Sequence, residues 1–222
     1  MVRFRLAAAM LVVLAGLVPA LVSTPAQAAP TAGVSVAEIS VAGGDILRSA
    51  GGASCQLGFN ISGRGILASS RCGPIGTRWY AGLVSVGVTT AVFASQDAAV
   101  ISIDNPAVGQ IAGRRVAGGA IAPVTAAARA YVGQIVGYYS ATLGARTGTV
   151  TGVNQTIYYS GGVLTGLDRT TLCATARDGG APIVAGSIGL SMLSGGSAGC
   201  DGGAVYAQPI VPLLTALGRT LY

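Results

Sequence analysis

From about residue 41 onward, the chain consists of short stretches rich in Val, Ile, Thr and Tyr in which hydrophobic and polar positions alternate in part. Such stretches favour β-strands, and 35 glycines among the 222 residues supply turns between them. A hairpin is expected where Ser62-Gly63-Arg64-Gly65 separates two of these stretches, 55–61 and 66–70. Further strands are expected at 79–84, 86–93, 98–103, 132–136 and 147–154. The pattern predicts an all-β fold.

Two segments depart from the strand pattern. Residues 209–217 have helical spacing and predict a short C-terminal helix, with apolar side chains at Ile210, Leu213, Leu214 and Leu217. The alanine-rich stretch 126–130 could form a second short helix, but Pro123 and the β-rich surroundings argue against it. The pattern determines little else between residues 105 and 130, where Gly118-Gly119 predicts a turn.

The N-terminus has the features of a secretory signal. Basic residues at 1–5 precede an apolar stretch at 6–22, and Ala26-Gln27-Ala28 matches a cleavage site. An uncleaved membrane anchor is the alternative, although the apolar stretch is short for a membrane span. We therefore expect a signal peptide at 1–28, a linker at 29–40, and one secreted domain at 41–222 with no later membrane span.

The charge of the chain is low and scattered. Only 9% of the residues are charged, and all 13 basic residues are arginines. Nucleic-acid binding would need a basic stripe with interleaved aromatic residues, and the sequence contains no such stripe. We expect a weakly cationic, monomeric protein without a nucleic-acid partner or a cofactor.

The cysteines and the missing residue types restrict the chemistry. Four cysteines in an exported chain indicate two disulfides, for which the sequence alone allows three connectivities. No metal site is expected, because there is no close cysteine pair and no histidine. A Ser-His-Asp, Cys-His or Ser-Lys site cannot form without His or Lys. Asp97 and Asp178 could form a glycosidase carboxylate pair, but no sugar-stacking aromatic residues accompany them.

Residues 173–182 read CATARDGGAP and are followed by Leu193-Ser194-Gly195-Gly196 and Cys200. This combination resembles the nucleophile loop and substrate strand of the chymotrypsin-fold serine peptidases, in particular the streptogrisin-like branch. In that family the loop reads Cys-Ala-x-x-Gly-Asp-Ser-Gly-Gly-Pro, and its serine is the nucleophile. The serine position is Gly179 in this chain.

Two other motifs carry the resemblance to the remaining catalytic positions. Residues 68–72 read ASSRC where the family reads Thr-Ala-Gly-His-Cys, so Arg71 stands at the position of the base. Residues 96–103 match the family's Asn-Asp segment, which places Asp97 at the position of the carboxylate. The alternatives are that Arg71 is a solvated loop residue and that Asp97 caps a strand.

The resemblance implies two orthogonal six-stranded β-barrels with a short C-terminal helix. It also implies the disulfides Cys55–Cys72 and Cys173–Cys200, and it brings Arg71 and Asp97 together in the cleft between the barrels, where we expect an ion pair. Tyr138-Tyr139 replaces a segment that in the family includes an arginine able to pair with the aspartate of the nucleophile loop. That partner is therefore expected to be missing here.

The sequence thus predicts a secreted serine-peptidase homologue that lacks the catalytic His and Ser and binds polypeptide without cutting it. Ser194, Gly195 and Gly196 would offer a strand edge to an extended peptide. The alternatives are a serine endopeptidase with residual or unconventional activity and a purely structural or surface-interaction domain.

Overall fold

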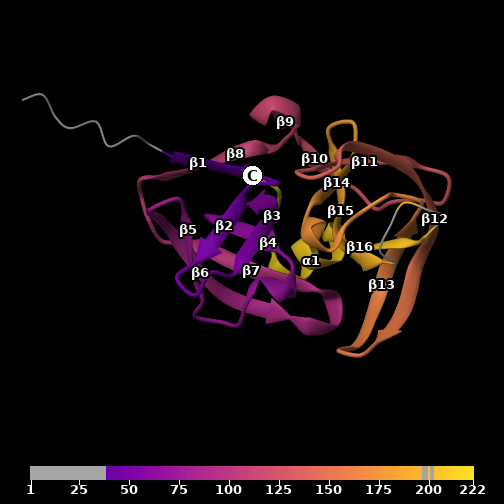
Figure 1. Cartoon of the computed structure of the whole chain (residues 1–222), viewed down its shortest axis with the longest axis horizontal. Helices are drawn as coiled ribbons and strands as arrows, with labels where there is room; N and C mark the ends of the chain where they lie inside the picture. Colours follow the sequence, from indigo (N-terminus) through magenta and orange to yellow (C-terminus); the bar gives the residue numbers. More distant parts are fainter. Residues whose placement is uncertain (1–38, 197–199, 201–202) are drawn as a thin grey trace, which may run out of the picture. The chain divides into compact units, whose positions relative to one another are not determined.

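Six strands of the N-terminal half close into a barrel in the order β2-β3-β4-β7-β6-β5 (Figure 1). The structure is a computed structural model that describes residues 39–196, 200 and 203–222. The predicted signal peptide and nearly all of the predicted linker lie outside these residues. The barrel strands are β2 (Ile46–Ser49), β3 (Ser54–Ile61), β4 (Gly65–Ala68), β5 (Arg78–Ala81), β6 (Val84–Phe93) and β7 (Ala98–Ile103).

The C-terminal half forms a second ring of strands. Its sheet has the order β10-β15-β14-β11-β12-β13-β16. Because β15 also pairs with β16, the six strands other than β10 form a closed ring. The strands are β10 (Ala126–Ala127), β11 (Ile135–Ser140), β12 (Gly144–Tyr159), β13 (Gly162–Thr170), β14 (Pro182–Ala185), β15 (Ile188–Gly196) and β16 (Val205–Pro209). The predicted all-β fold of two six-stranded barrels is confirmed.

A small third sheet accounts for the part of the sequence between the barrels that the pattern left undetermined. It has the order β1-β8-β9, and β1 pairs with β8 in parallel. Its strands are β1 (Ile39–Gly43), β8 (Val108–Arg115) and β9 (Ile121–Pro123). The turn predicted at Gly118-Gly119 lies between β8 and β9, within the 3-10 turn Ala117–Gly119.

Three local expectations differ from the structure. The strand expected at 132–136 begins only at Ile135, because Gly133 has a φ of +90° and lies in a turn. The possible helix at 126–130 is a strand, because Ala126–Ala127 pairs in parallel with β15 and the Ala128 amide donates to the Gly189 carbonyl at 3.1 Å. The strand expected at 79–84 ends at Ala81, because Gly82 has a φ of +59° and turns the chain toward β6. The predicted C-terminal helix is confirmed as α1 (Ile210–Leu217).

A core shared by both barrels fixes their contact. Phe59 and Leu67 of the first barrel pack in one buried cluster with Met192 of the second and Ile210 of α1. The approach is close at Gly58, where a Cβ would lie 2.8 Å from Met192 Cγ. A side chain at residue 58 would displace Met192 and would also lie 2.9 Å from the Leu67 carbonyl oxygen, so glycine suits this close contact.

Both implied disulfides are present. Cys55–Cys72 and Cys173–Cys200 have Cα separations of 4.8 and 4.7 Å. Cys72 follows Arg71 directly, and Cys173 begins the loop that contains Gly179. The bonds close loops of 17 and 27 residues, and each is expected to stabilise the fold by about 3 kcal/mol in the chain-entropy picture. The two disulfides therefore hold the two loops that carry the family motifs.

Candidate functional site

The carboxylate of Asp97 is buried and fully engaged by side chains that precede Cys72. Ser69 Oγ and Ser70 Oγ donate to its Oδ1 atom at 2.7 and 2.8 Å. Arg71 Nη2 donates to Oδ2 at 3.1 Å. A buried carboxylate is costly unless it is paired and hydrogen-bonded, and these three donors meet both conditions.

Arg71 reaches Asp97 from a short 3-10 turn, Ser70–Cys72, that Ser69 caps by accepting from the Arg71 amide. The ion pair expected between Arg71 and Asp97 is confirmed. The side chains are unequally buried, since Arg71 is 58% exposed and Asp97 only 3%. Arg71 therefore covers the carboxylate and still presents part of its guanidinium to solvent.

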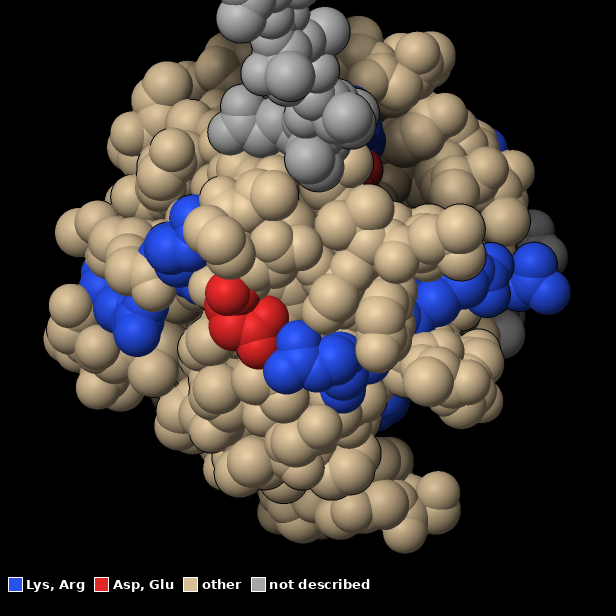
Figure 2. Space-filling model, turned by 90° about the vertical axis from the view of Figure 1, so that its left-hand side faces the viewer, with Lys and Arg blue, Asp and Glu red and all other residues tan. Residues whose placement is uncertain are grey.

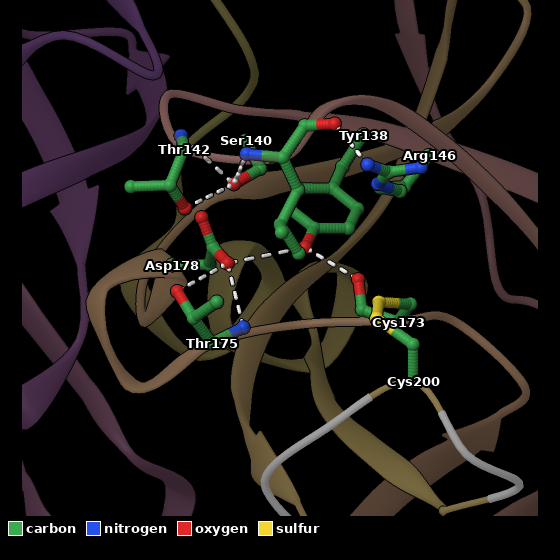
Figure 3. The surroundings of a disulfide bond; sticks show 9 residues. Tyr138, Ser140, Thr142, Arg146, Cys173, Thr175, Asp178 and Cys200 are labelled. Carbon is green, nitrogen blue, oxygen red and sulfur yellow. Dashed lines mark hydrogen bonds between the residues drawn. A yellow bond between two sulfur atoms is a disulfide. The ribbon is translucent and has the colours of Figure 1, made fainter.

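The loop at the nucleophile position is built around Asp178, which is buried (Figure 3). Thr175 and Asp178 form a capping box across the 3-10 turn Ala176–Asp178. The Thr175 amide and hydroxyl both donate to Asp178 Oδ2, at 2.7 and 2.8 Å. The Arg177 amide in turn donates to Thr175 Oγ1 at 3.3 Å, so this amide hydrogen points into the loop.

Tyr138 of β11 completes the surroundings of Asp178 (Figure 3). Its hydroxyl lies 2.7 Å from the Cys173 carbonyl oxygen and 3.2 Å from Asp178 Oδ2. Burial, together with the neighbouring Asp178 carboxylate, raises the pKa of Tyr138, so the phenol keeps the proton that it donates. The partner expected to be missing is therefore replaced by a neutral hydrogen-bond donor.

Gly179 follows this turn and lies directly beneath Arg71. Its backbone angles, φ −57° and ψ 127°, are accessible to any residue. A Cβ at this position would, however, lie 3.2 Å from Arg71 Nη2. Glycine therefore leaves room for the guanidinium in its present position, and a side chain here would require the guanidinium to shift.

Ser194, Gly195 and Gly196 end β15 and have one free edge. On one side Gly195 pairs with Tyr206 of β16. On the other side the pairing with the chain around β14 ends at Leu193, which exchanges backbone hydrogen bonds with Gly180 and Ala181. Beyond Leu193 no described strand continues this edge. The Ser194 hydroxyl is buried and has no hydrogen-bond partner among the described residues.

Two cavities open on either side of Arg71. A cavity of about 510 Å³ lies beside the free edge of β15. The other has a volume of about 610 Å³ and lies beside Gly179. The first is lined by Arg71, Asp97 and residues 194–196, together with Ile157, Tyr158, Tyr159, Leu164 and Tyr206. The second is lined by Arg48, Arg71, Arg177, Gly179 and six other residues, none of them acidic.

The rest of the molecular surface has few charges. Figure 2 shows one face, where most of the surface is uncharged and the acidic residues in the centre lie against an arginine. Two further salt bridges join Arg78 to Asp104 and Arg115 to Asp45. Within residues 39–196, 200 and 203–222, no group of three metal-ligating side chains comes together. In the same ranges, no helix has the length and apolar character that a membrane span requires.

Solved structures place the fold among the chymotrypsin-like proteases. An alpha-lytic protease homologue, N4, matches with a TM-score of 0.75 and 39% identity, over 82% of this chain and all of that one. The chymotrypsin of Cellulomonas bogoriensis matches with a TM-score of 0.75 and 30% identity, over 83% of this chain and 99% of that one. No family model matches the sequence.

Curated relatives identify the family within the chymotrypsin-like proteases. Serine protease 2 of Streptomyces fradiae is 38% identical over 173 residues, which cover 73% of this chain and 98% of that protein. Streptogrisin-A of Streptomyces griseus is 37% identical over 188 residues, which cover 82% of this chain and 61% of that protein. This chain therefore spans only about three-fifths of the length of streptogrisin-A. The chain belongs to the streptogrisin-like family of chymotrypsin-fold serine proteases.

The motifs located Arg71, Asp97, Gly179 and Ser194–Gly196, and the structure brings them around one cleft. Sequence reasoning missed the hydroxyl donors to Asp97, the role of Tyr138, and the tyrosines and arginines of the cavity walls. Two signals were available for part of this. Ser69 and Ser70 immediately precede Arg71, and Thr175-Ala176-Arg177-Asp178 has the spacing of a capping box.

Proposed function

We propose that this protein is a secreted, non-hydrolytic member of its family that binds extended polypeptide in the cleft between its barrels. The observation that carries the proposal is the position of Arg71. Its guanidinium pairs with Asp97, lies against Gly179 and lines the cavity beside the free edge of β15. A cation that cannot act as a base thus occupies the cleft next to a strand edge that can still accept a peptide.

Loss of hydrolysis is supported first by the residues themselves. The fold's chemistry needs a nucleophile and a base, and these positions hold Gly179 and Arg71. The chain contains no His or Lys to replace the base, and arginine does not release its proton in proteins. Loss of triad members costs on the order of 10⁴- to 10⁶-fold in kcat.

The loop geometry supports the same conclusion. In this fold the oxyanion hole uses the amides of the nucleophile and of the residue two positions before it. In this chain those residues are Gly179 and Arg177, and the Arg177 amide donates to Thr175 Oγ1. One of the two donors that would stabilise a developing oxyanion is therefore already engaged inside the protein.

Peptide binding is supported by the free edge and its cavity. An extended peptide can add to Ser194–Gly196 as an antiparallel strand through main-chain hydrogen bonds. The tyrosines of the cavity offer large apolar faces to its side chains. A purely structural role would be favoured by a closed cleft, and the cavity of about 510 Å³ argues against it.

Secretion and domain limits are part of the proposal. The N-terminal sequence has the order of a signal peptide, and both disulfides suit an oxidising compartment. We place the folded domain at residues 41–222 and infer that it acts as a monomer.

The proposal is tested with the purified, disulfide-intact protein. We expect no turnover of chromogenic peptides, no labelling by a fluorophosphonate, and saturable binding of peptides from an extended-peptide library. Tyr158→Ala should weaken binding because Tyr158 lines the cavity and is largely exposed. The control is Tyr131→Ala, another exposed tyrosine, which lines none of the described cavities. Turnover that Asp97→Ala abolishes would refute the lack of hydrolysis, and a library without any binder would refute the binding function.

A further inference from the structure

We propose that the polypeptide bound in this cleft is a chain end whose free C-terminal carboxylate is held by Arg71 and Arg177. This inference rests on the proposed function and specifies its ligand. The four observations behind it are the position of Arg71, its unused donors, the charge of the neighbouring cavity and the direction of the free edge.

Arg71 stands where an extended peptide on β15 would meet the nucleophile loop. Its Nη2 atom is 3.2 Å from the place of a Cβ on Gly179, and its Nη1 atom is 3.8 Å from the place of a Cβ on Gly195. Arg71 also lines both cavities. The guanidinium therefore lies at the boundary between the aromatic cavity and the arginine-lined one.

The guanidinium has donors left for a ligand. Of its five N–H groups, the one on Nε is directed at Ser69 Oγ and one on Nη2 donates to Asp97. Both hydrogens on Nη1 and the second one on Nη2 have no acceptor among the described residues. A carboxylate has the planar pair of oxygens that matches such a fork, whereas an amide nitrogen would bring another donor.

The charge of the second cavity favours an anion. Asp97 offsets the charge of Arg71, but Arg48 and Arg177 also line this cavity and no acidic residue does. Arg48 donates only to the neutral Ser54 Oγ. The Arg177 side chain has no hydrogen bond or ion pair with any described residue. Two positive charges are thus uncompensated at the place where the bound chain would end.

The direction of the strand places the carboxyl end correctly. A peptide antiparallel to β15 starts beside Gly196 and runs toward Ser194, so its C-terminal end approaches Arg71 and Gly179. Ser194, whose buried hydroxyl lacks a partner among the described residues, is one of the residues that line the same cavity. A chain that continued past this point would have to pass the guanidinium and would place a neutral amide where two uncompensated arginines lie.

The experiment compares one library-selected peptide in three forms: with a C-terminal acid, with a C-terminal amide, and extended by two residues ending in an amide. Affinities are measured by fluorescence anisotropy with the label at the peptide N-terminus. We expect the acid to bind at least about tenfold more tightly than either other form, and the advantage to shrink as salt screens the arginines.

Matched variants identify the residues. Arg177→Gln should remove most of the preference for the acid, because it should weaken binding of the acid far more than binding of the amide. Arg169→Gln is the control, because it changes the net charge equally at an exposed residue that lines none of the described cavities. Arg71→Gln should reduce the preference further, and its folding is verified by thermal unfolding.

Several results would overturn the inference. Equal affinity for acid and amide would do so while leaving polypeptide binding intact, whereas no binding by any form would refute the proposed function itself. If an amidated peptide with an added internal glutamate binds as tightly as the acid, the arginines bind a carboxylate side chain and not the end of the chain. If inorganic phosphate displaces the labelled peptide as effectively as the unlabelled acid peptide does, the two arginines form a site for a free anion.

Discussion

The Arg71 guanidinium lies against Gly179, so a side chain on residue 179 would have to displace it. A Cβ there would lie 3.2 Å from Arg71 Nη2, closer than side-chain atoms normally approach. We therefore expect Gly179→Ser alone to give no peptide turnover and no fluorophosphonate labelling. Labelling of this single variant would show that a serine at this position reacts without a histidine base.

The double variant Arg71→His, Gly179→Ser restores the residue types of an active triad in front of Asp97. We expect slow fluorophosphonate labelling, because a histidine on Asp97 can accept the serine proton. Peptide turnover should remain on the order of 10²- to 10³-fold below that of an active relative, because the Arg177 amide donates to Thr175. Full turnover by the double variant would show that the oxyanion site is intact.

Arg71→Ala removes the cation from a buried carboxylate. Asp97 would keep its two hydroxyl donors, and solvent already screens the half-exposed Arg71. We expect a loss of about 1–2 kcal/mol in the free energy of unfolding, measured by urea denaturation. The matched control is Arg78→Ala, whose partner Asp104 is 42% exposed and where the loss should be clearly smaller. Equal losses in the two variants would contradict a special role for the buried pair.

Tyr138→Phe deletes the hydroxyl that bridges Cys173 and Asp178. The carbonyl and the buried carboxylate would lose the one hydroxyl hydrogen that lies between them, and we expect the free energy of unfolding to fall by about 1–3 kcal/mol. Tyr139→Phe is the control, because Tyr139 is the next residue in the chain and its hydroxyl has no hydrogen bond with any described residue. An unchanged stability of Tyr138→Phe would mean that Thr175 alone is sufficient to hold Asp178.

Asp168 should make the protein less stable as pH rises. Burial raises the pKa of this carboxyl, although Ser191 Oγ donates to it at 2.5 Å and Arg129 is nearby. A raised folded-state pKa means that its stabilising contribution is complete below the ordinary Asp pKa of 3.8 and is lost as pH rises through the higher value. Asp168→Asn should therefore gain stability relative to the parent as pH increases from about 4 to 7.

The measurement for Asp168 is a series of urea denaturations across that pH range. Asp104→Asn is the control with the opposite sign, because Arg78 lowers the pKa of Asp104. In the parent protein, the stabilising contribution of Asp104 is lost as pH falls through the lowered pKa. Asp104→Asn should therefore be less stable than the parent at neutral pH. A constant difference between Asp168→Asn and the parent at all pH values would show that residue 168 does not titrate differently on folding.

The sequence was most informative where a pattern is local. The helical spacing of 209–217, the turn between β3 and β4 and the cysteine-flanked motifs all depend on neighbouring residues. Pairings between distant segments left no such pattern. The parallel contact of Ile39 with Val108 and the strand Ala126–Ala127 are set by partners far along the chain.

The residues of the candidate site likewise divide into those that a local motif predicts and those that only the folded structure brings together. Arg71, Asp97 and Gly179 could be located from the sequence because each lies within a short motif of neighbouring residues. The role of Tyr138 could not be predicted, since a tyrosine in a strand usually packs in the core and its bond to Asp178 spans 40 residues. The aromatic wall of the cavity beside β15 comes from β12, β13 and β16, whose approach only the folded barrel determines.

The unpartnered Ser194 hydroxyl couples occupancy of the cleft to the thermal stability of the whole protein. Burying a hydroxyl without a partner is unfavourable, so the empty molecule folds against a cost that a bound main chain would relieve. A ligand that binds only the native state raises the unfolding temperature with its concentration. The melting temperature can therefore report, without any label or enzymatic readout, which peptides bind the native protein.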